Sequence, residues 1–215
     1  MTSKIFTSTL LVAAVFAGTA CVASTSLEEE LNDVTGQEEV DVSVNEEKAQ
    51  PIQQMVEKWD CPGCNSNERY VLSKIQDYTK ITDRNALSTL MGNIKSESNF
   101  HANICEGGAR IGFWSCTRGG YGLIQWTTVD RYNGLAHHAR QVGYDPSTVD
   151  AQVSYIFTER QWKGIESSLK NEGQSIGYYM QKAYYWLGWG HHGRRTDYAY
   201  EYANRLLLTE VPVTK

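Results

Sequence analysis

Residues 87–126 set the strictest limits on how this chain can fold. The stretch begins with LSTLMGNIKSESNF, passes through a glycine-rich loop and ends with GGYGLIQW. Leu87, Leu90 and Ile94 recur at the spacing typical of the buried stripe of an amphipathic helix. A helix that runs into a tight, glycine-lined turn is therefore the predicted centre of the fold.

Glu97 follows Ile94 by three residues, so it continues the same buried stripe. A carboxylate at the end of an apolar face is poorly hydrated, and this favours its protonated form and raises its pKa. A raised pKa is what a general acid needs near neutral pH. Glu97 is therefore the candidate acid. The structural alternative is that it caps the helix or pairs with a lysine or arginine.

The second half of the stretch offers candidate substrate-binding residues. Glycines beside a turn let the backbone approach a ligand closely, and Gly122 follows such a turn. The Gln125 amide can donate to and accept from sugar hydroxyls or an N-acetyl group. Trp126 could stack on a sugar ring or pack in the core, and Tyr121 lies between the glycines. We therefore take Tyr121, Gly122, Gln125 and Trp126 as candidates for binding substrate.

Together, GNIKSESNF and GGYGLIQW resemble the active-site core of the lysozyme-like superfamily, and more narrowly of the phage tail lysozyme family, over about residues 70–208. Goose-type lysozymes and soluble lytic transglycosylases share the arrangement more distantly. The resemblance implies an α+β, mostly α fold, a lysozyme-like helical domain with a small β-hairpin lining the cleft. It also implies cleavage of peptidoglycan glycan strands, with Glu97 as the acid. Residues 194–199 match a recurring ending of that family, and we take them as a fold marker.

Hydrolysis of a glycosidic bond normally uses two carboxyl groups. Between Glu97 and Gln125 the sequence holds one other acid, Glu106, on the glycine-rich loop. Glu106 is therefore the candidate general base, and the alternative is an exposed loop acid. Asp130 is the next candidate, although its place favours a helix N-terminus. A lytic transglycosylase would need no such base.

Aromatic residues gather near the C-terminal end in Tyr184-Tyr185-Trp186 and in Trp189. Aromatic side chains near loops can form platforms for sugars, so Tyr185 is a candidate for binding substrate. The alternative is ordinary helix packing. His191-His192 lacks a nearby carboxylate or cysteine to complete a metal site, so neither a metal nor a cofactor is expected.

The cysteines favour disulfide bonds over a metal site. Cys61, Cys64, Cys105 and Cys116 make an even set, and four cysteines allow three connectivities. The locally simplest pairing joins Cys61 to Cys64 and Cys105 to Cys116. A four-cysteine zinc site is the alternative, but the first C-x2-C has no second one to match it.

Charge and hydropathy divide the chain into three parts. Residues 1–23 read as a secretory signal peptide, although Cys21 leaves lipidation open. Residues 24–58 read as an acidic, disordered linker, because residues 27–47 hold nine acids without a lysine or arginine. Residues 59–215 are the predicted catalytic domain, and no other stretch predicts a membrane span.

Local patterns predict several helices in this domain. Asn65-x-x-Glu68 and Ser147-x-x-Asp150 read as capping boxes, and Thr82 or Asp83 is expected to cap the helix of Glu97. Residues 165–190 read as a looser segment, and residues 196–208 as the last helix. The small hairpin is expected over residues 110–125.

The predicted function is that of a muramidase that cleaves the β-1,4 bond between N-acetylmuramic acid and N-acetylglucosamine. The alternatives are a lytic transglycosylase and a non-catalytic wall-binding or virion structural module. A cysteine endopeptidase beginning at Asp60-Cys61 lacks a downstream histidine on a strand. The expected partner is peptidoglycan outside the cell or in the periplasm, or at a virion, with no nucleic acid; the oligomeric state stays open.

Overall fold

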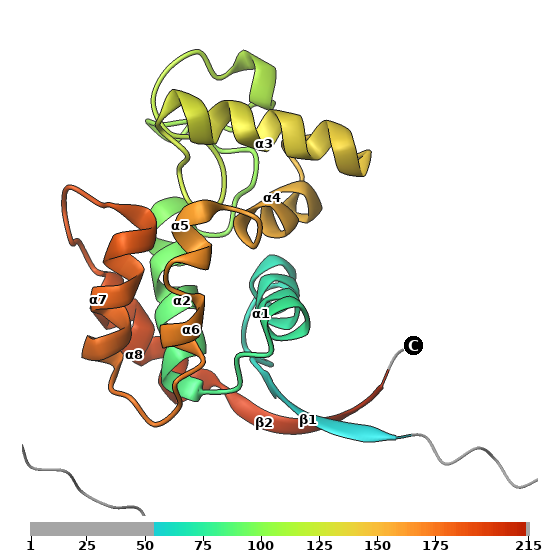
Figure 1. The fold of residues 1–215 in the computed structure, drawn as a ribbon, viewed down its shortest axis with the longest axis vertical. Helices are drawn as coiled ribbons and strands as arrows, with labels where there is room; N and C mark the ends of the chain where they lie inside the picture. Colours follow the sequence, from blue (N-terminus) through green and yellow to red (C-terminus); the bar gives the residue numbers. More distant parts are fainter. Residues whose placement is uncertain (1–53, 214–215) are drawn as a thin grey trace, which may run out of the picture. The chain divides into compact units, whose positions relative to one another are not determined.

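The computed structural model describes residues 54–213, which fold mostly into helices with one two-stranded antiparallel sheet (Figure 1). This confirms the predicted α+β, mostly α class. The expected signal peptide and most of the expected linker lie outside the described residues. In chain order the elements are β1 (Met55–Asp60), α1 (Ser66–Thr79), α2 (Arg84–Ser98), the 3-10 turn η1 (Phe113–Ser115), α3 (Val129–Val142), α4 (Val149–Ile156), α5 (Arg160–Lys163), α6 (Glu166–Leu169), α7 (Ile176–Leu187), α8 (Arg195–Arg205) and β2 (Leu207–Pro212).

Helix α2 is the central helix of the domain. Leu87, Leu90 and Ile94 are buried as predicted, and the residues between them are buried as well. A helix that is enclosed on all sides belongs in the middle of a fold, and α1, α7 and α8 surround α2. The side chain of Asp83 caps its first turn by accepting from the Ala86 N–H at 2.8 Å.

The packing of α2 on α8 depends on Gly92. A Cβ at this position would lie 2.5 Å from the backbone nitrogen of Ala199 and 2.9 Å from the carbonyl oxygen of Arg195. The absence of a side chain therefore lets the two helix backbones approach closely. This approach brings the first turn of α8 beside the last turns of α2, where Glu97 lies.

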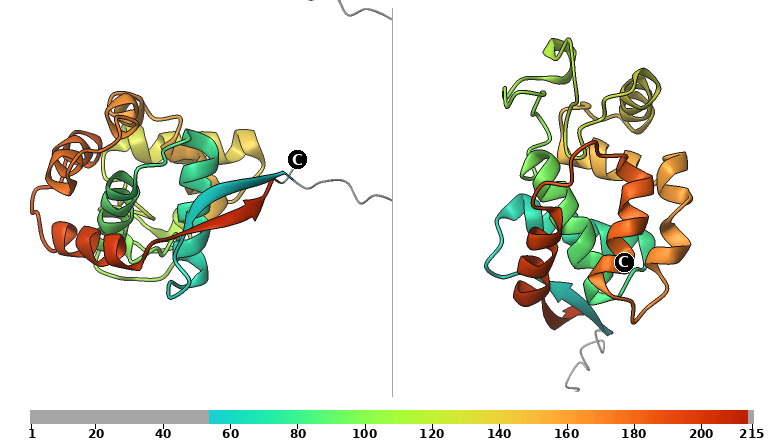
Figure 2. Two further views of the ribbon diagram at one scale, coloured as in Figure 1. Left: turned by 90° about the horizontal axis from the view of Figure 1, so that it is seen from below. Right: turned by 90° about the vertical axis from the view of Figure 1, so that its left-hand side faces the viewer.

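The only sheet in the described residues is formed by β1 and β2, at the opposite end of the domain from the predicted hairpin (Figure 2). Met55 pairs with Pro212 and Asp60 with Leu207. The hairpin was predicted at the wrong position, over residues 110–125. That segment forms isolated bridges, such as Cys105 with Tyr121, because its glycine-rich turns interrupt any longer ladder. Strand β1 also begins four residues before the domain boundary expected at Trp59.

Both expected disulfides are present, Cys61–Cys64 beside β1 and Cys105–Cys116 in the segment between α2 and α3. The second one closes the loop that carries Glu106. No helix of the described residues has both the length and the apolar character needed to cross a membrane.

The helix boundaries follow the predictions from local sequence only in part. The capping box of Asn65 and Glu68 is confirmed at the start of α1. Helix α4 is instead capped by Thr148, whose side chain accepts from Ala151, while Ser147 accepts from the Phe113 N–H at 2.8 Å. Residues 165–190 are more regular than expected, because α7 buries a full stripe on α2, and α8 ends at Arg205 where the chain enters β2.

Candidate active site

A cavity of about 400 Å³ opens where α2, the following loop and the segment before α8 meet. It contains both candidate carboxylates, Glu97 from the last turn of α2 and Glu106 from the disulfide-closed loop. Its lining residues are Glu97, Glu106, Gly120, Ile124, Gln125, Thr127, Leu187, Gly188, Trp189, Gly190, His191 and Arg195. The structure thus brings three of the seven predicted site residues, Glu97, Glu106 and Gln125, to one cavity.

Glu97 is largely buried, with 14% of its side chain exposed. Burial raises the pKa of this carboxyl above its ordinary value, and the nearby guanidinium groups of Arg195 and Arg131 offset part of the rise. Oε1 of Glu97 accepts a hydrogen bond from Nη2 of Arg195 in an ion pair. Glu97 therefore pairs with an arginine, as the structural alternative expected. It is also poorly hydrated, as expected of a general acid.

Arg195 is the site residue that the sequence did not reveal, since residues 194–199 read only as a fold marker. It lies 98 residues beyond Glu97 and becomes its neighbour only through the packing of α8 on α2. Its Nη1 donates to the carbonyl oxygens of His191 at 3.0 Å and His192 at 2.9 Å. Its guanidinium carbon lies 4.9 Å from the centroid of the Trp189 ring. Arg195 thus ties the wall formed by residues 187–191 to the candidate acid.

Glu106 is exposed and lines the same cavity as Glu97. Its Oε2 accepts from the Gly120 N–H at 2.8 Å, and its own N–H donates to the Gly120 carbonyl at 2.8 Å. Gly119 adopts a φ of +76°, and a Cβ there would lie 2.1 Å from Oε2 of Glu106. The glycine turn is therefore what gives the Glu106 carboxylate its place.

Gln125 also lines the cavity, in a left-handed backbone conformation with a φ of 52°. This conformation is uncommon for a residue other than glycine and recurs at functional segments. Its Nε2 donates to the Gly122 carbonyl at 3.0 Å, which holds the amide against the turn. The amide side chain is therefore fixed in orientation beside the two carboxylates.

Three residues expected to touch substrate are placed in the interior instead. Tyr121 and Trp126 are fully buried, and their polar atoms donate to the Ile111 carbonyl at 3.0 Å and to Glu159 at 3.0 Å. Gly122 is buried with a φ of +76°, and a Cβ there would lie 2.4 Å from the side chain of Gln152. These residues shape the loop from behind, because the large rings gain more from burial than from exposure.

Behind Trp126 lies a second buried carboxylate, Glu159, which sequence reasoning also missed. Arg131 binds it through two nitrogens, Nε to Oε1 at 2.7 Å and Nη2 to Oε2 at 2.9 Å. Its side chain is 1% exposed. A buried acid paired in this way joins α3 to the start of α5 and supports the loop that carries Gln125.

Tyr185, the seventh predicted residue, is 71% exposed on α7. It lies outside the cavity of Glu97 and lines a second cavity of about 340 Å³ together with Tyr184 and Trp189. Trp189 lines both cavities. Tyr185 is therefore a neighbour of the candidate active site rather than a part of it.

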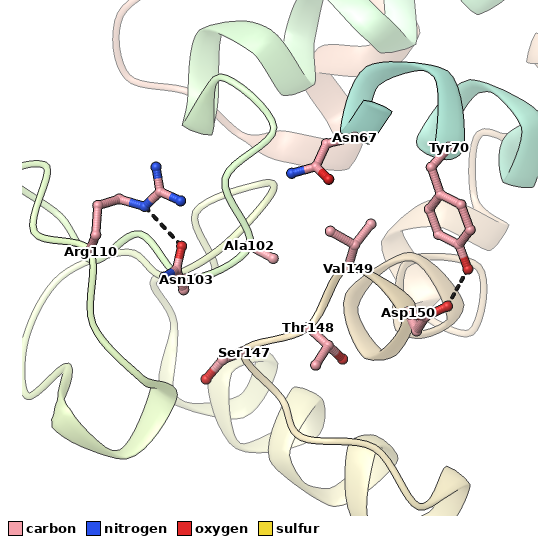
Figure 3. Close-up of a pocket in the computed structure, with 9 residues that line it drawn as sticks. All are labelled: Asn67, Tyr70, Ala102, Asn103, Arg110, Ser147, Thr148, Val149 and Asp150. Carbon is pink, nitrogen blue, oxygen red and sulfur yellow. Dashed lines mark hydrogen bonds between the residues drawn. The ribbon is translucent and has the colours of Figure 1, made fainter. Parts of the chain in front are cut away.

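A further cavity of about 430 Å³ lies between the N-terminal ends of α1 and α4 and the loop of Asn103 (Figure 3). Its polar side chains are largely paired with one another, Tyr70 with Asp150 and Arg110 with Asn103. None of the seven predicted site residues lines it, and no buried acid faces it. Within residues 54–213 no group of three or more histidine, cysteine, aspartate or glutamate side chains could hold a metal ion.

Comparison with known proteins identifies a family for this chain. The family model described as phage tail lysozyme matches residues 67–206, a range that contains Glu97, Glu106, Gln125 and Arg195. Neither the curated proteins nor the solved structures include a match to the chain. The match spans well over half of the 215 residues and indicates a cell-wall hydrolase of the lysozyme kind. The chain belongs to the phage tail lysozyme family.

Proposed function

We propose that the protein is a muramidase that hydrolyses the β-1,4 bond between N-acetylmuramic acid and N-acetylglucosamine in peptidoglycan. The observation that carries the proposal is the position of Glu97, a buried carboxyl with a raised pKa at the wall of a cavity that also holds Glu106. Two carboxyl groups in contrasting surroundings are what glycoside hydrolysis requires.

Glu97 is the general acid. Its raised pKa keeps a proton on a fraction of the molecules at a pH where an exposed glutamate would have lost it. This proton passes to the glycosidic oxygen as the bond to the sugar breaks. Arg195 holds Oε1, so the carboxyl cannot rotate away from the cavity, and the guanidinium stabilises the carboxylate that remains after proton transfer.

Glu106 is the general base. It is exposed to water, and its Oε2 is held by the Gly120 N–H. Removing a proton from a water molecule on the opposite side of the sugar ring would activate that water for attack. In this assignment the two carboxylates act within one cavity.

Gln125 orients the sugar. Its Nε2 is committed to the Gly122 carbonyl, so its Oε1 is the atom we assign to a sugar hydroxyl or an N-acetyl N–H. The partner is the glycan strand of the wall, reached by export or from a virion.

Mass spectrometry of the products released from purified peptidoglycan tests the proposal. Hydrolysis predicts fragments that end in a reducing N-acetylmuramic acid. Anhydro ends would instead identify the protein as a lytic transglycosylase. In that reaction Glu97 remains the acid and Glu106 has no part. Reducing N-acetylglucosamine ends would move the cut to the other bond. Intact glycan strands, with or without cut peptides, would reject glycosidase activity altogether.

A further inference from the structure

The second cavity adjoins the candidate active site along the surface of α7. Its lining residues are Met180, Gln181, Tyr184, Tyr185, Trp189 and His192. Trp189 lines both cavities, so the two cavities are neighbours on the surface.

A row of stacked side chains leads from the acid to the second cavity. Arg195, which pairs with Glu97, lies over the Trp189 ring at 4.9 Å. Trp189 packs edge to face on Tyr184 with ring centroids 5.2 Å apart, and Tyr184 on Tyr185 at 5.9 Å. Packed side chains thus connect Glu97 to residues that line the second cavity.

The exposure of the two tyrosines is not explained by packing. Helix α7 already buries a complete inward stripe, formed by Ile176, Tyr179, Met180, Ala183 and Trp186. Tyr184 is 48% exposed and Tyr185 is 71% exposed on another face of the helix. A soluble helix normally presents charged or polar side chains there, so adjacent exposed rings beside a cleft indicate a binding surface.

The chemistry of the lining selects the ligand. None of the six lining residues is an aspartate, glutamate, lysine or arginine, whereas the cavity of Glu97 holds two carboxylates and a guanidinium. Ring faces pack on apolar C–H surfaces, and Gln181 and His192 can hydrogen bond to hydroxyl or amide groups. An uncharged pyranose fits this lining better than a sugar that carries an acidic peptide.

We propose that the second cavity is a subsite for an uncharged, non-reacting sugar of the same glycan strand, an N-acetylglucosamine unit, with Tyr185 as its stacking platform. This inference rests on the proposed function, because the glycan must also pass Glu97. Binding energy gained away from the reacting bond can improve the capture of long chains. Short chains confined to the cavity of Glu97 gain nothing from it.

The test is calorimetric titration of the full-length chain carrying Glu97→Gln with chitohexaose and with chitobiose, uncharged β-1,4 oligomers of N-acetylglucosamine. In that background Tyr185→Ala should weaken chitohexaose binding roughly three- to tenfold, the range of a lost aromatic contact. Tyr185→Phe keeps the ring and should bind as the parent does. Tyr200→Ala removes a tyrosine that is 55% exposed on α8 and lines neither cavity, so it should also have no effect.

Hydrolysis of purified walls provides a second measurement with Glu97 intact. Tyr185→Ala should raise KM by a similar factor and leave kcat near that of the parent. Unchanged chitohexaose binding and unchanged KM would overturn the subsite, even if the walls are cleaved. Walls left uncut by a chain whose chitohexaose binding depends on Tyr185 would instead refute the proposed function and support the subsite. Absence of both binding and cleavage would overturn both.

Discussion

Glu97 and Glu159 are both carboxylates with little exposed surface that pair with an arginine, yet their surroundings differ. Arg131 binds both oxygens of Glu159, the indole of Trp126 donates to the same group, and the side chain is 1% exposed. Glu97 is held by Arg195 through Oε1 and is 14% exposed at a cavity wall. Burial by itself therefore does not mark a catalytic acid. The carboxyl suited to chemistry is the one that keeps part of its surface open to a ligand.

The largest effect should come from breaking the pair that serves the structure. Arg131→Met leaves Glu159 buried without its cation, which costs about 3–5 kcal/mol of folding free energy. For a domain of this size the melting temperature should fall by roughly 10 °C. Thermal unfolding followed by circular dichroism measures the change.

A matched control is Arg194→Met, which removes an exposed arginine that pairs with Asp197 and Glu201. Exposed ion pairs contribute about 1 kcal/mol or less, so its melting temperature should stay near that of the parent. Equal decreases in melting temperature for Arg131→Met and Arg194→Met would contradict the larger contribution expected of the buried ion pair.

The variant Glu106→Gln should lower the rate of wall hydrolysis without changing the melting temperature. Removing a general base typically lowers the rate by about a hundredfold or more, whereas the exposed loop site contributes little to the core. Wall hydrolysis and thermal unfolding of the same preparation separate the two effects. Glu210→Gln on β2 changes an exposed acid far from the cavity and serves as the control. Full activity of Glu106→Gln would remove Glu106 from the mechanism.

The helix that carries Glu97 could be predicted because its information is local. The spacing of Leu87, Leu90 and Ile94 identifies the buried stripe, and the capping box of Asn65 and Glu68 identifies the start of α1. The close spacing of Cys105 and Cys116 likewise favoured the disulfide that is found. Each of these signals involves residues that are neighbours along the chain.

The partners of the two acids could not be predicted, because tertiary packing creates them. Arg195 lies 98 residues from Glu97, and Arg131 lies 28 residues from Glu159. Dependence on tertiary packing also explains why the predicted exposure of two aromatic residues to substrate was not found. The sequence indicated that Tyr121 and Trp126 belong to the active-site loop, but only the packing of that loop on α3 and α4 decides that they face inward.

The variant Arg195→Gln tests how the arginine affects the pKa of Glu97. The guanidinium favours the ionised form of Glu97 and so lowers a pKa that burial raises. Its removal should raise that pKa further. Because the acid works in its protonated form, the alkaline limb of the pH–rate profile should move to higher pH. Arg195→Lys keeps the charge and should leave the limb near its original place. An unchanged limb in Arg195→Gln would show that Arg195 only supports the wall.

The smallest effect concerns the stability of the parent protein against pH. The pKa of Glu97 is raised in the folded state above its ordinary value of 4.5, so the folded state binds this proton more tightly than the unfolded chain does. The resulting stabilisation is complete below about pH 4.5 and is lost as pH rises through the folded pKa. Relative to Glu97→Gln, the parent should therefore lose stability as pH rises from about 4.5 through the folded pKa of Glu97. A constant difference between the two melting curves would contradict the raised pKa.

The most direct test of the account measures wall hydrolysis and thermal unfolding for Glu97→Gln and Glu159→Gln side by side. Glu97→Gln should keep its fold and hydrolyse walls at least about a hundredfold more slowly, the usual effect of losing a general acid. Glu159→Gln should melt several degrees lower and keep most of its rate per folded molecule, since it lies behind the cavity. A folded Glu97→Gln variant that cleaves walls at close to the parental rate would contradict the assignment of Glu97 as the acid.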